Sequence, residues 1–322
     1  MGYNVTIDEK TGFGECFTMG FLTVLQQMGV IAFLVAIGVF VGKRGIVDTV
    51  SSKSISTLVV DICNPALMLT SVLGGSITAD HAELLTAGAV AVIFYAVLVL
   101  IGFVLPPILK VDVDKHRFYN MMCVYTNVGF IGIPVAHAVL PPDGMLCVLV
   151  CNVMYSLLFY THGVAVLSGN KQKIRPAQIL SPGTIAAVLS ILIVWFRVSL
   201  PDAVSETIAY VGNGTVFLSM MLLGVSIARS GLLEGIKSLR LWMFILVRMV
   251  ALPALLALVL KCLQLDPVIT AGMCLMAAMP VGNLPLIQAE KTGEDTTILS
   301  HAIAVTTVVS MVTITVFMVV LA

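Results

Sequence analysis

Long apolar segments alternate with short polar segments along the whole chain. Windows of about twenty apolar residues, the length that an α-helix needs to cross a bilayer, recur ten times. They predict membrane-spanning helices over residues 19–42, 54–74, 84–109, 117–140, 144–168, 181–200, 204–229, 240–263, 268–289 and 296–321. The pattern therefore predicts an all-α polytopic membrane protein with ten transmembrane helices.

The fourth predicted span is interrupted by residues that weaken a helix. Its sequence is RFYNMMCVYTNVGFIGIPVAHAV, with Thr126, Asn127, Gly129 and Pro134 near the middle. Lipid offers no hydrogen-bond partner to a freed backbone group, so an unwound segment at this depth has to be buried in protein or line a wet cavity.

The second half of the chain repeats this pattern. The ninth span is interrupted in its middle by Pro280, Gly282, Asn283 and Pro285. Spans two and seven also match, because NPALMLTSVLGGSI and NGTVFLSMMLLGVSI both start at an asparagine and end in Ser-Ile. We predict a 5+5 inverted repeat with broken, crossing helices 4 and 9. Its parts are residues 1–168, a cytoplasmic linker over 169–180, and residues 181–322. Paired interruptions of this kind mark the cargo site of secondary transporters.

Composition and charge agree with a membrane protein. Hydrophobic residues make up 59% of the chain and charged residues 11%, whereas about 25% is charged in a typical soluble domain. The net charge is zero and there is no basic tract, so we expect no nucleic-acid partner. Thirteen Lys and Arg residues fall on one side of the predicted spans and three on the other. The bias predicts a multi-pass protein of the cell inner membrane with both termini outside.

Seven cysteines are scattered through apolar segments and show no CxxC or Cys/His spacing. We therefore expect no metal site and no disulfide framework.

These features resemble the auxin efflux carrier family, whose bacterial members include organic-acid permeases, within the broader group of bile acid/sodium symporters. The resemblance rests on NVGFIGIP from Asn127, on AAMPVGNLPLIQAEKTGED from Ala277, and on span count over the whole chain. It implies a mobile transport domain of spans three to five and eight to ten, in which spans four and nine unwind and cross. It also implies a scaffold of spans one, two, six and seven that dimerises, so we expect a homodimer. The short linker favours a bacterial carrier over a plant-type auxin carrier.

The candidate substrate-binding residues lie in or beside the two interruptions. Helix N-termini carry partial positive charge, and asparagine amides donate hydrogen bonds, so such a site suits a carboxylate. The alternative is that both helices are only kinked for packing. The candidates are Asn127, Thr126, Gly129, Pro134, Asn152, Tyr155, Pro280, Gly282, Asn283, Pro285, Asn64 and Asn213. A hydroxyl stripe in span ten, which includes Thr306, either lines the pathway or bonds its own backbone.

Four ionisable residues are candidates for a charge or coupling role. Asp61 and Arg248 lie inside spans, where an unpaired charge is costly. They either pair with each other, or Arg248 clamps an anion while Asp61 carries a coupling proton or steadies the scaffold. Glu290 and His301 lie near the cytoplasmic end of the ninth and tenth spans. His301 is either a proton carrier or an interfacial residue.

We predict a secondary active transporter of a small organic anion such as malate, working by elevator-like alternating access. We expect no cofactor, but coupling to H⁺ or Na⁺. The alternatives are a carrier of auxin-like aromatic carboxylates, a sodium-coupled symporter of the bile-acid type, and a channel. An intramembrane enzyme is disfavoured, since the chain has no HExxH and no paired aspartates at membrane depth. Gly38 and Gly42 form a GxxxG motif that favours helix association in the scaffold.

Overall fold

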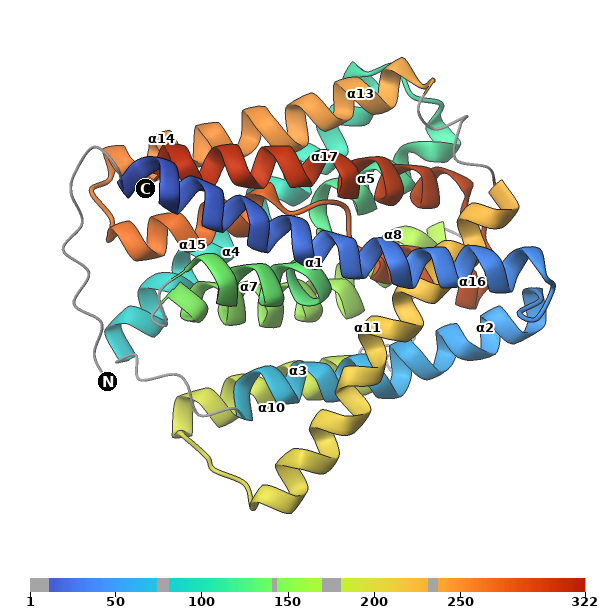
Figure 1. The fold of residues 1–322 in the computed structure, drawn as a ribbon, viewed down its shortest axis with the longest axis horizontal. Coiled ribbons are helices and arrows are strands. Elements are labelled where there is room, and N and C mark those ends of the chain that lie inside the picture. Colours follow the sequence, from blue (N-terminus) through green and yellow to red (C-terminus); the bar gives the residue numbers. More distant parts are fainter. Residues whose placement is uncertain (1–11, 74–80, 141–143, 170–180, 231–236, 322) are drawn as a thin grey trace.

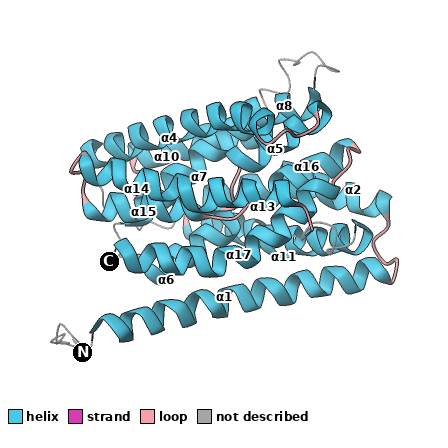
Figure 2. Ribbon diagram, turned by 90° about the horizontal axis from the view of Figure 1, so that it is seen from above, coloured by secondary structure: helices cyan, strands magenta, loops and turns pink. Residues whose placement is uncertain are grey.

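A computed structural model describes residues 12–73, 81–140, 144–169, 181–230 and 237–321. The described chain is a bundle of helices (Figures 1 and 2). Its first half contains α1 (Gly12–Lys43), α2 (Thr49–Leu58), η1 (Val59–Cys63), α3 (Asn64–Leu73), α4 (His81–Ile108), η2 (Val113–Lys115), α5 (His116–Val124), η3 (Val128–Gly132), α6 (Ile133–Val139), α7 (Met145–Leu158), η5 (Phe159–Gly163) and α8 (Val164–Ser168). Its second half contains α10 (Pro182–Phe196), α11 (Asp202–Ser230), α13 (Leu239–Ile245), η7 (Leu246–Ala251), α14 (Leu252–Cys262), α15 (Pro267–Ala278), α16 (Leu284–Thr292) and α17 (Thr297–Leu321).

Six helical segments within the described residues are long and apolar enough to cross a membrane. They are Thr49–Leu73, His81–Ile108, Met145–Ser168, Asp202–Arg229, Leu239–Cys262 and Thr297–Phe317. Shorter apolar helices cover Gly29–Lys43, Pro182–Phe196 and Pro267–Ala278. The chain is therefore an all-helical, multi-pass membrane protein, while the count of ten spans stays a prediction. The start of α1 and the end of α17 lie at one end of the bundle, and α16 lies nearer the other (Figure 1).

Three of the long segments contain a wide, π-helical turn. The turn η1 joins α2 to α3 and carries Asp61, η5 joins α7 to α8 and carries His162, and η7 joins α13 to α14 and carries Arg248. A π-turn rotates the helix face that follows it, and such turns often occur at functional sites. Each turn therefore changes which side chains of its segment face the interior.

The interrupted helices lie in the core of the bundle. Every residue of 118–128 and of 272–290 is buried. Unwound backbone at membrane depth is tolerated only where protein covers it or a wet cavity adjoins it. The burial of both segments meets that requirement.

The GxxxG motif of α1 is used inside the protein. A Cβ atom on Gly224 of α11 would lie 2.7 Å from the Cα atom of Gly38, and a Cβ on Gly42 would lie 3.1 Å from the Cα of Val225. Glycine at these positions lets α1 and α11 approach backbone to backbone. The motif therefore packs two helices of one chain, and it is no evidence for a dimer.

Replacing Gly224 with alanine should lower the free energy of unfolding by about 1–3 kcal/mol, because the added methyl group meets backbone that cannot move aside locally. The matched control is Gly88→Ala in α4, where a Cβ meets nothing within 4 Å. There alanine should be neutral or stabilising, since it favours the helix. Thermal unfolding in detergent micelles measures both. Equal stability of the two variants would show that the α1–α11 contact is not tight.

Candidate functional site

The two helix breaks meet each other in the core. The first break follows α5 and the second follows α15, and Thr126 and Val281 form an isolated antiparallel β-bridge between them. The N–H of Asn127 donates to the carbonyl of Pro280 at 2.8 Å, and the N–H of Gly282 donates to the carbonyl of Tyr125 at 2.8 Å. The breaks thus satisfy each other's freed backbone groups. The prediction that both helices break at these positions is confirmed.

An asparagine stands where each helix resumes. Asn127 precedes η3, and its Oδ1 accepts a hydrogen bond from the N–H of Ile131 at 3.2 Å. Asn283 is the N-cap of α16, and its carbonyl accepts from the N–H of Ile287 at 3.0 Å. Because the first N–H groups of a helix lack intrahelical partners, both positions carry partial positive charge.

A small cavity of about 20 Å³ lies between the breaks. It is lined by Asn64, Thr126, Asn127, Gly129, Asn152, Tyr155, Gly282, Asn283 and Leu284. Four of these are asparagines, and none is charged. The space admits roughly one or two water molecules, each of which needs about 10–15 Å³ measured this way. The site is therefore a neutral pocket rich in carboxamide groups.

Two polar atoms at this cavity have no hydrogen-bond partner among the described residues. They are Oγ1 of Thr126 and Oδ1 of Asn283, both fully buried. Among the described residues, the amide nitrogen of Asn283 has one hydrogen-bond partner, the sulfur of Met220, at 3.4 Å. Buried polar groups normally have partners, and an unpartnered one calls for an explanation such as a ligand or water. The amide of Asn283 is thus available to a bound molecule.

The other predicted substrate-binding residues lie outside the cavity lining. Asn213 is exposed on α11 and does not line the cavity, so its role in the site stays a prediction. Pro280 is buried in the second break, where its carbonyl accepts the hydrogen bond from the N–H of Asn127. Pro285 is buried just after that break. Pro134 is the second residue of α6, and its side chain lies outside the described part of the structure.

Asp61 and Arg248 do not pair with each other, contrary to one of the two readings of the sequence. The Nζ atom of Lys291 lies 2.7 and 2.6 Å from the two carboxylate oxygens of Asp61. Arg248 donates from Nε to the carbonyl of Cys123 and from Nη1 to that of Ala277, each at 2.7 Å. Neither residue lines the cavity, so Arg248 is not placed to clamp a molecule bound there.

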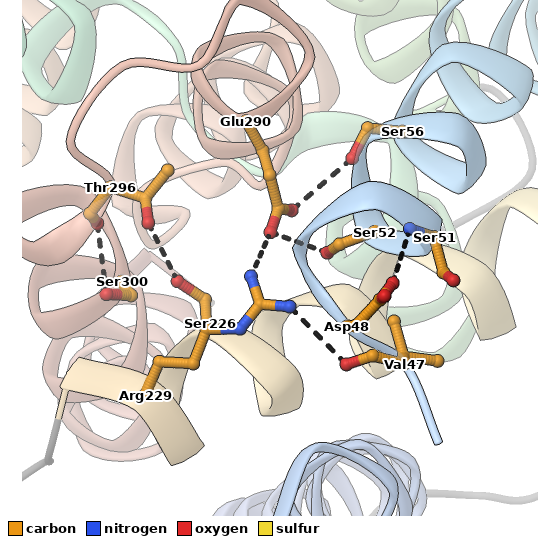
Figure 3. A network of polar contacts seen from close by, with 10 residues as sticks. All are labelled: Val47, Asp48, Ser51, Ser52, Ser56, Ser226, Arg229, Glu290, Thr296 and Ser300. Atoms are coloured by element: carbon orange, nitrogen blue, oxygen red, sulfur yellow. Dashed lines mark hydrogen bonds and ion pairs between the residues drawn. The ribbon is translucent and has the colours of Figure 1, made fainter. Parts of the chain in front are cut away.

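Glu290 is the centre of a network of polar side chains (Figure 3). Its carboxylate accepts from Ser52 at 2.6 Å and from Ser56 at 3.3 Å, and it pairs with Arg229 at 3.0 Å. The network joins α2, α11 and α16, and a hydrogen bond between Ser226 and Thr296 at 3.1 Å extends it. Glu290 therefore holds helices together and does not line the cavity.

Two partners in these contacts were missed by sequence reasoning. From the sequence, Lys291 and Arg229 were interpreted only as charges that set the orientation of the protein in the membrane. In the structure, Lys291 pairs with Asp61 and Arg229 pairs with Glu290. The available signal was the adjacent pair Glu290-Lys291 at the end of an apolar segment, where two opposite charges need separate partners.

His301 and His162 do not line the cavity. His301 of α17 is buried, and its Nε2 has no partner among the described residues. His162, a weaker candidate from the sequence, shares a 2.8 Å hydrogen bond with the hydroxyl of Tyr125 in the first break.

The hydroxyl groups of the stripe in span ten form hydrogen bonds mainly with backbone groups. Thr306 accepts a hydrogen bond from the N–H of Val281 at 3.1 Å and so supports the second break, while it also donates to the carbonyl of Ala302. Ser310 and Thr313 donate to carbonyls of their own helix. Of these three residues, Thr306 is therefore the one that joins the site, where it supports the backbone of the second break.

Comparison with known proteins agrees with a transport role for this fold and site. The membrane transport protein family matches residues 23–177 and 172–318. The chain therefore belongs to the membrane transport protein family, which is the auxin efflux carrier family. It is also 22% identical over 295 residues to an uncharacterized transporter of Methanocaldococcus jannaschii, covering 88% of this chain and 94% of that protein. The protein is thus a membrane transporter, a class that normally performs no enzymatic reaction.

Proposed function

We propose that the protein is a secondary active transporter of a small organic anion such as malate, which it binds between the two helix breaks. The observation that carries this proposal is the meeting of both breaks at a cavity with four asparagine side chains. Within this proposal the chain forms ten membrane spans in a 5+5 inverted repeat, and the interrupted fourth and ninth spans cross at the β-bridge.

The site chemistry fits a carboxylate. Carboxylate oxygens accept hydrogen bonds from carboxamide groups, and hydrogen bonds to a charged acceptor are stronger than those between neutral groups. The starts of η3 and α16 add partial positive charge from two directions. Together these groups stabilise an anion without a lysine or arginine in direct contact.

The size of the cavity favours a carrier that changes conformation. About 20 Å³ is far below the roughly 300–1,000 Å³ of pockets that hold larger ligands, so an organic acid needs the site to open. In our proposal the opening comes from an elevator-like shift of the transport domain against the scaffold. Asn64 belongs to the proposed scaffold and Asn152 to the proposed transport domain, so the cavity would lie at their boundary.

Two ion pairs cross the same proposed boundary. Glu290 and Lys291 of α16 pair with Arg229 of α11 and Asp61 of η1. A shift of the domains would have to break both pairs. Their partly exposed partners would then be hydrated by water, which lowers the cost of separation.

The remaining parts of the proposal concern coupling and assembly. We propose coupling to H⁺ or Na⁺, with His301 as the proton candidate because its Nε2 is buried without a partner in the described chain. The charge bias of the loops favours the cell inner membrane with both termini outside. The resemblance favours a homodimer formed through the scaffold helices.

Uptake into liposomes tests this function. Purified protein is reconstituted and supplied with labelled malate, succinate or indole-3-acetate under an imposed pH or Na⁺ gradient. We expect saturable uptake of a small dicarboxylate, driven by one of the gradients. Saturable uptake of indole-3-acetate alone would assign an aromatic carboxylate instead. Electrical currents at single-channel rates would contradict a carrier, and no uptake of any acid would remove the organic-anion assignment.

A further inference from the structure

Arg248 is a buried cation inside a membrane-spanning segment and has an unusual set of partners. Only 1% of the residue is exposed, and its guanidinium donates to two backbone carbonyls, of Cys123 and of Ala277. No carboxylate pairs with it among the described residues. An unpaired charge at this depth is costly, so some other negative charge has to offset it.

The two carbonyls belong to equivalent places in the broken helices. Cys123 is the next-to-last residue of α5, and Ala277 is the next-to-last residue of α15. The last four carbonyls of a helix have no intrahelical partner, and the C-terminus carries about half a negative charge. Two such ends sum to about one negative charge, which the single guanidinium offsets.

A single arginine donates hydrogen bonds to the C-terminal ends of both α5 and α15, although the two halves of the chain resemble each other in sequence. The third predicted span, 84–109, which corresponds to the eighth span that carries Arg248, contains no charged residue. The compensating positive charge therefore comes from the second half of the chain alone, although it contacts the backbone beside both breaks. Arg248 also ties the end of α5 to the end of α15 through its two hydrogen bonds.

Arg248 and the helix ends around the breaks all contribute to the electrostatic potential at the cavity. Four helix ends meet near the breaks, since α5 and α15 end there and η3 and α16 begin there. Two partly negative and two partly positive ends nearly cancel. The positive charge of Arg248 offsets the two negative helix ends, so the two positive helix ends determine the sign of the potential at the cavity.

We propose that Arg248 is a positioning residue that makes the cavity attractive to anions in proportion to their charge, without touching them. The inference rests on the proposed function, because it explains how that site selects an anion. It differs from a direct clamp, in which loss of one contact would weaken all carboxylates alike. It also differs from a purely structural role, which would not depend on the charge of the ligand.

The test compares malate with its monoamide, which has a similar shape and one negative charge less, as inhibitors of labelled malate uptake at pH 7. For Arg248→Gln we expect the inhibition constant to rise roughly a hundredfold for malate and roughly tenfold for the monoamide. About tenfold per charge is the order expected for charges about 10 Å apart at an effective dielectric constant of about 20.

A second variant keeps the test decisive if Arg248→Gln does not fold. Cys123→Asp retains Arg248 and puts a carboxylate beside it, so it should produce the same charge-dependent loss. Equal losses for malate and the monoamide, in whichever variant folds, would overturn the inference and leave the carrier function standing. If the wild-type protein takes up no malate, the proposed function itself fails, and the inference fails with it.

Discussion

Replacing Asn283 with alanine should weaken organic-anion uptake roughly 10- to 100-fold while leaving the stability of the protein nearly unchanged. Among the described residues, the Oδ1 atom of Asn283 has no partner, and its amide nitrogen has one hydrogen-bond partner, the sulfur of Met220. The amide therefore contributes little to folding. A hydrogen bond to a charged group contributes about 1.5–3 kcal/mol, which corresponds to the expected loss of affinity.

The matched control is Asn213→Ala. Asn213 has the same side chain and begins the corresponding sequence motif, but it is exposed on α11 and does not line the cavity. Its removal should leave the KM for uptake within about twofold of wild type, in line with the small effects of surface substitutions. Equal uptake by both variants would contradict a binding role for Asn283.

Replacing Glu290 with glutamine should lower the free energy of unfolding by roughly 2–3 kcal/mol. The side chain of Glu290 is only 6% exposed, and the substitution leaves Arg229 without its counter-charge. Breaking a buried pair from one side costs more than the pair contributes when both partners are present, although the 37% exposure of Arg229 reduces the cost. Thermal unfolding of the purified protein in detergent measures the change.

Two further variants show whether the loss of stability comes from the Glu290 network or from the removal of any charged residue. Asp112→Asn breaks the exposed pair with Lys115 and should change the free energy of unfolding by less than about 0.5 kcal/mol. The double variant Glu290→Gln, Arg229→Gln should be less destabilised than the sum of its single variants, because the two charges act together. Additive losses would show that Glu290 and Arg229 do not depend on each other.

The parts of the site that are local in sequence could be predicted from it. Glycine, proline and asparagine in the middle of an apolar segment weaken a helix wherever the segment lies, so the breaks beside Asn127 and Asn283 were predictable. Asn152 and Tyr155 lie three residues apart on one helical face, and both line the cavity. In each case the evidence lies within a few residues of the site.

Asn213 shows where symmetry in sequence fails to predict orientation. It matches Asn64 in its motif, but the wide turn η1 ends directly before Asn64 and rotates the face that carries it. The helix α11 runs without such a turn through Asn213. A π-turn has no clear sequence signature, so the different orientations could not be predicted.

The partners of the charged residues could not be predicted because they are distant in sequence. Lys291 and Asp61 are 230 residues apart, and the partners of Arg248 are backbone carbonyls, which every residue has. A sequence shows that a buried charge needs compensation, but the fold decides which group supplies it.

Counterflow of labelled malate in proteoliposomes tests most directly whether the two helix breaks form the transport site. Liposomes loaded with unlabelled malate should accumulate the label transiently with the wild-type protein and with Asn213→Ala, because a carrier exchanges one bound molecule for another. Asn127→Ala and Asn283→Ala should lose this exchange at low malate concentration. Undiminished exchange by both of these variants would contradict the proposed site, since the asparagines of the breaks would then have no part in binding.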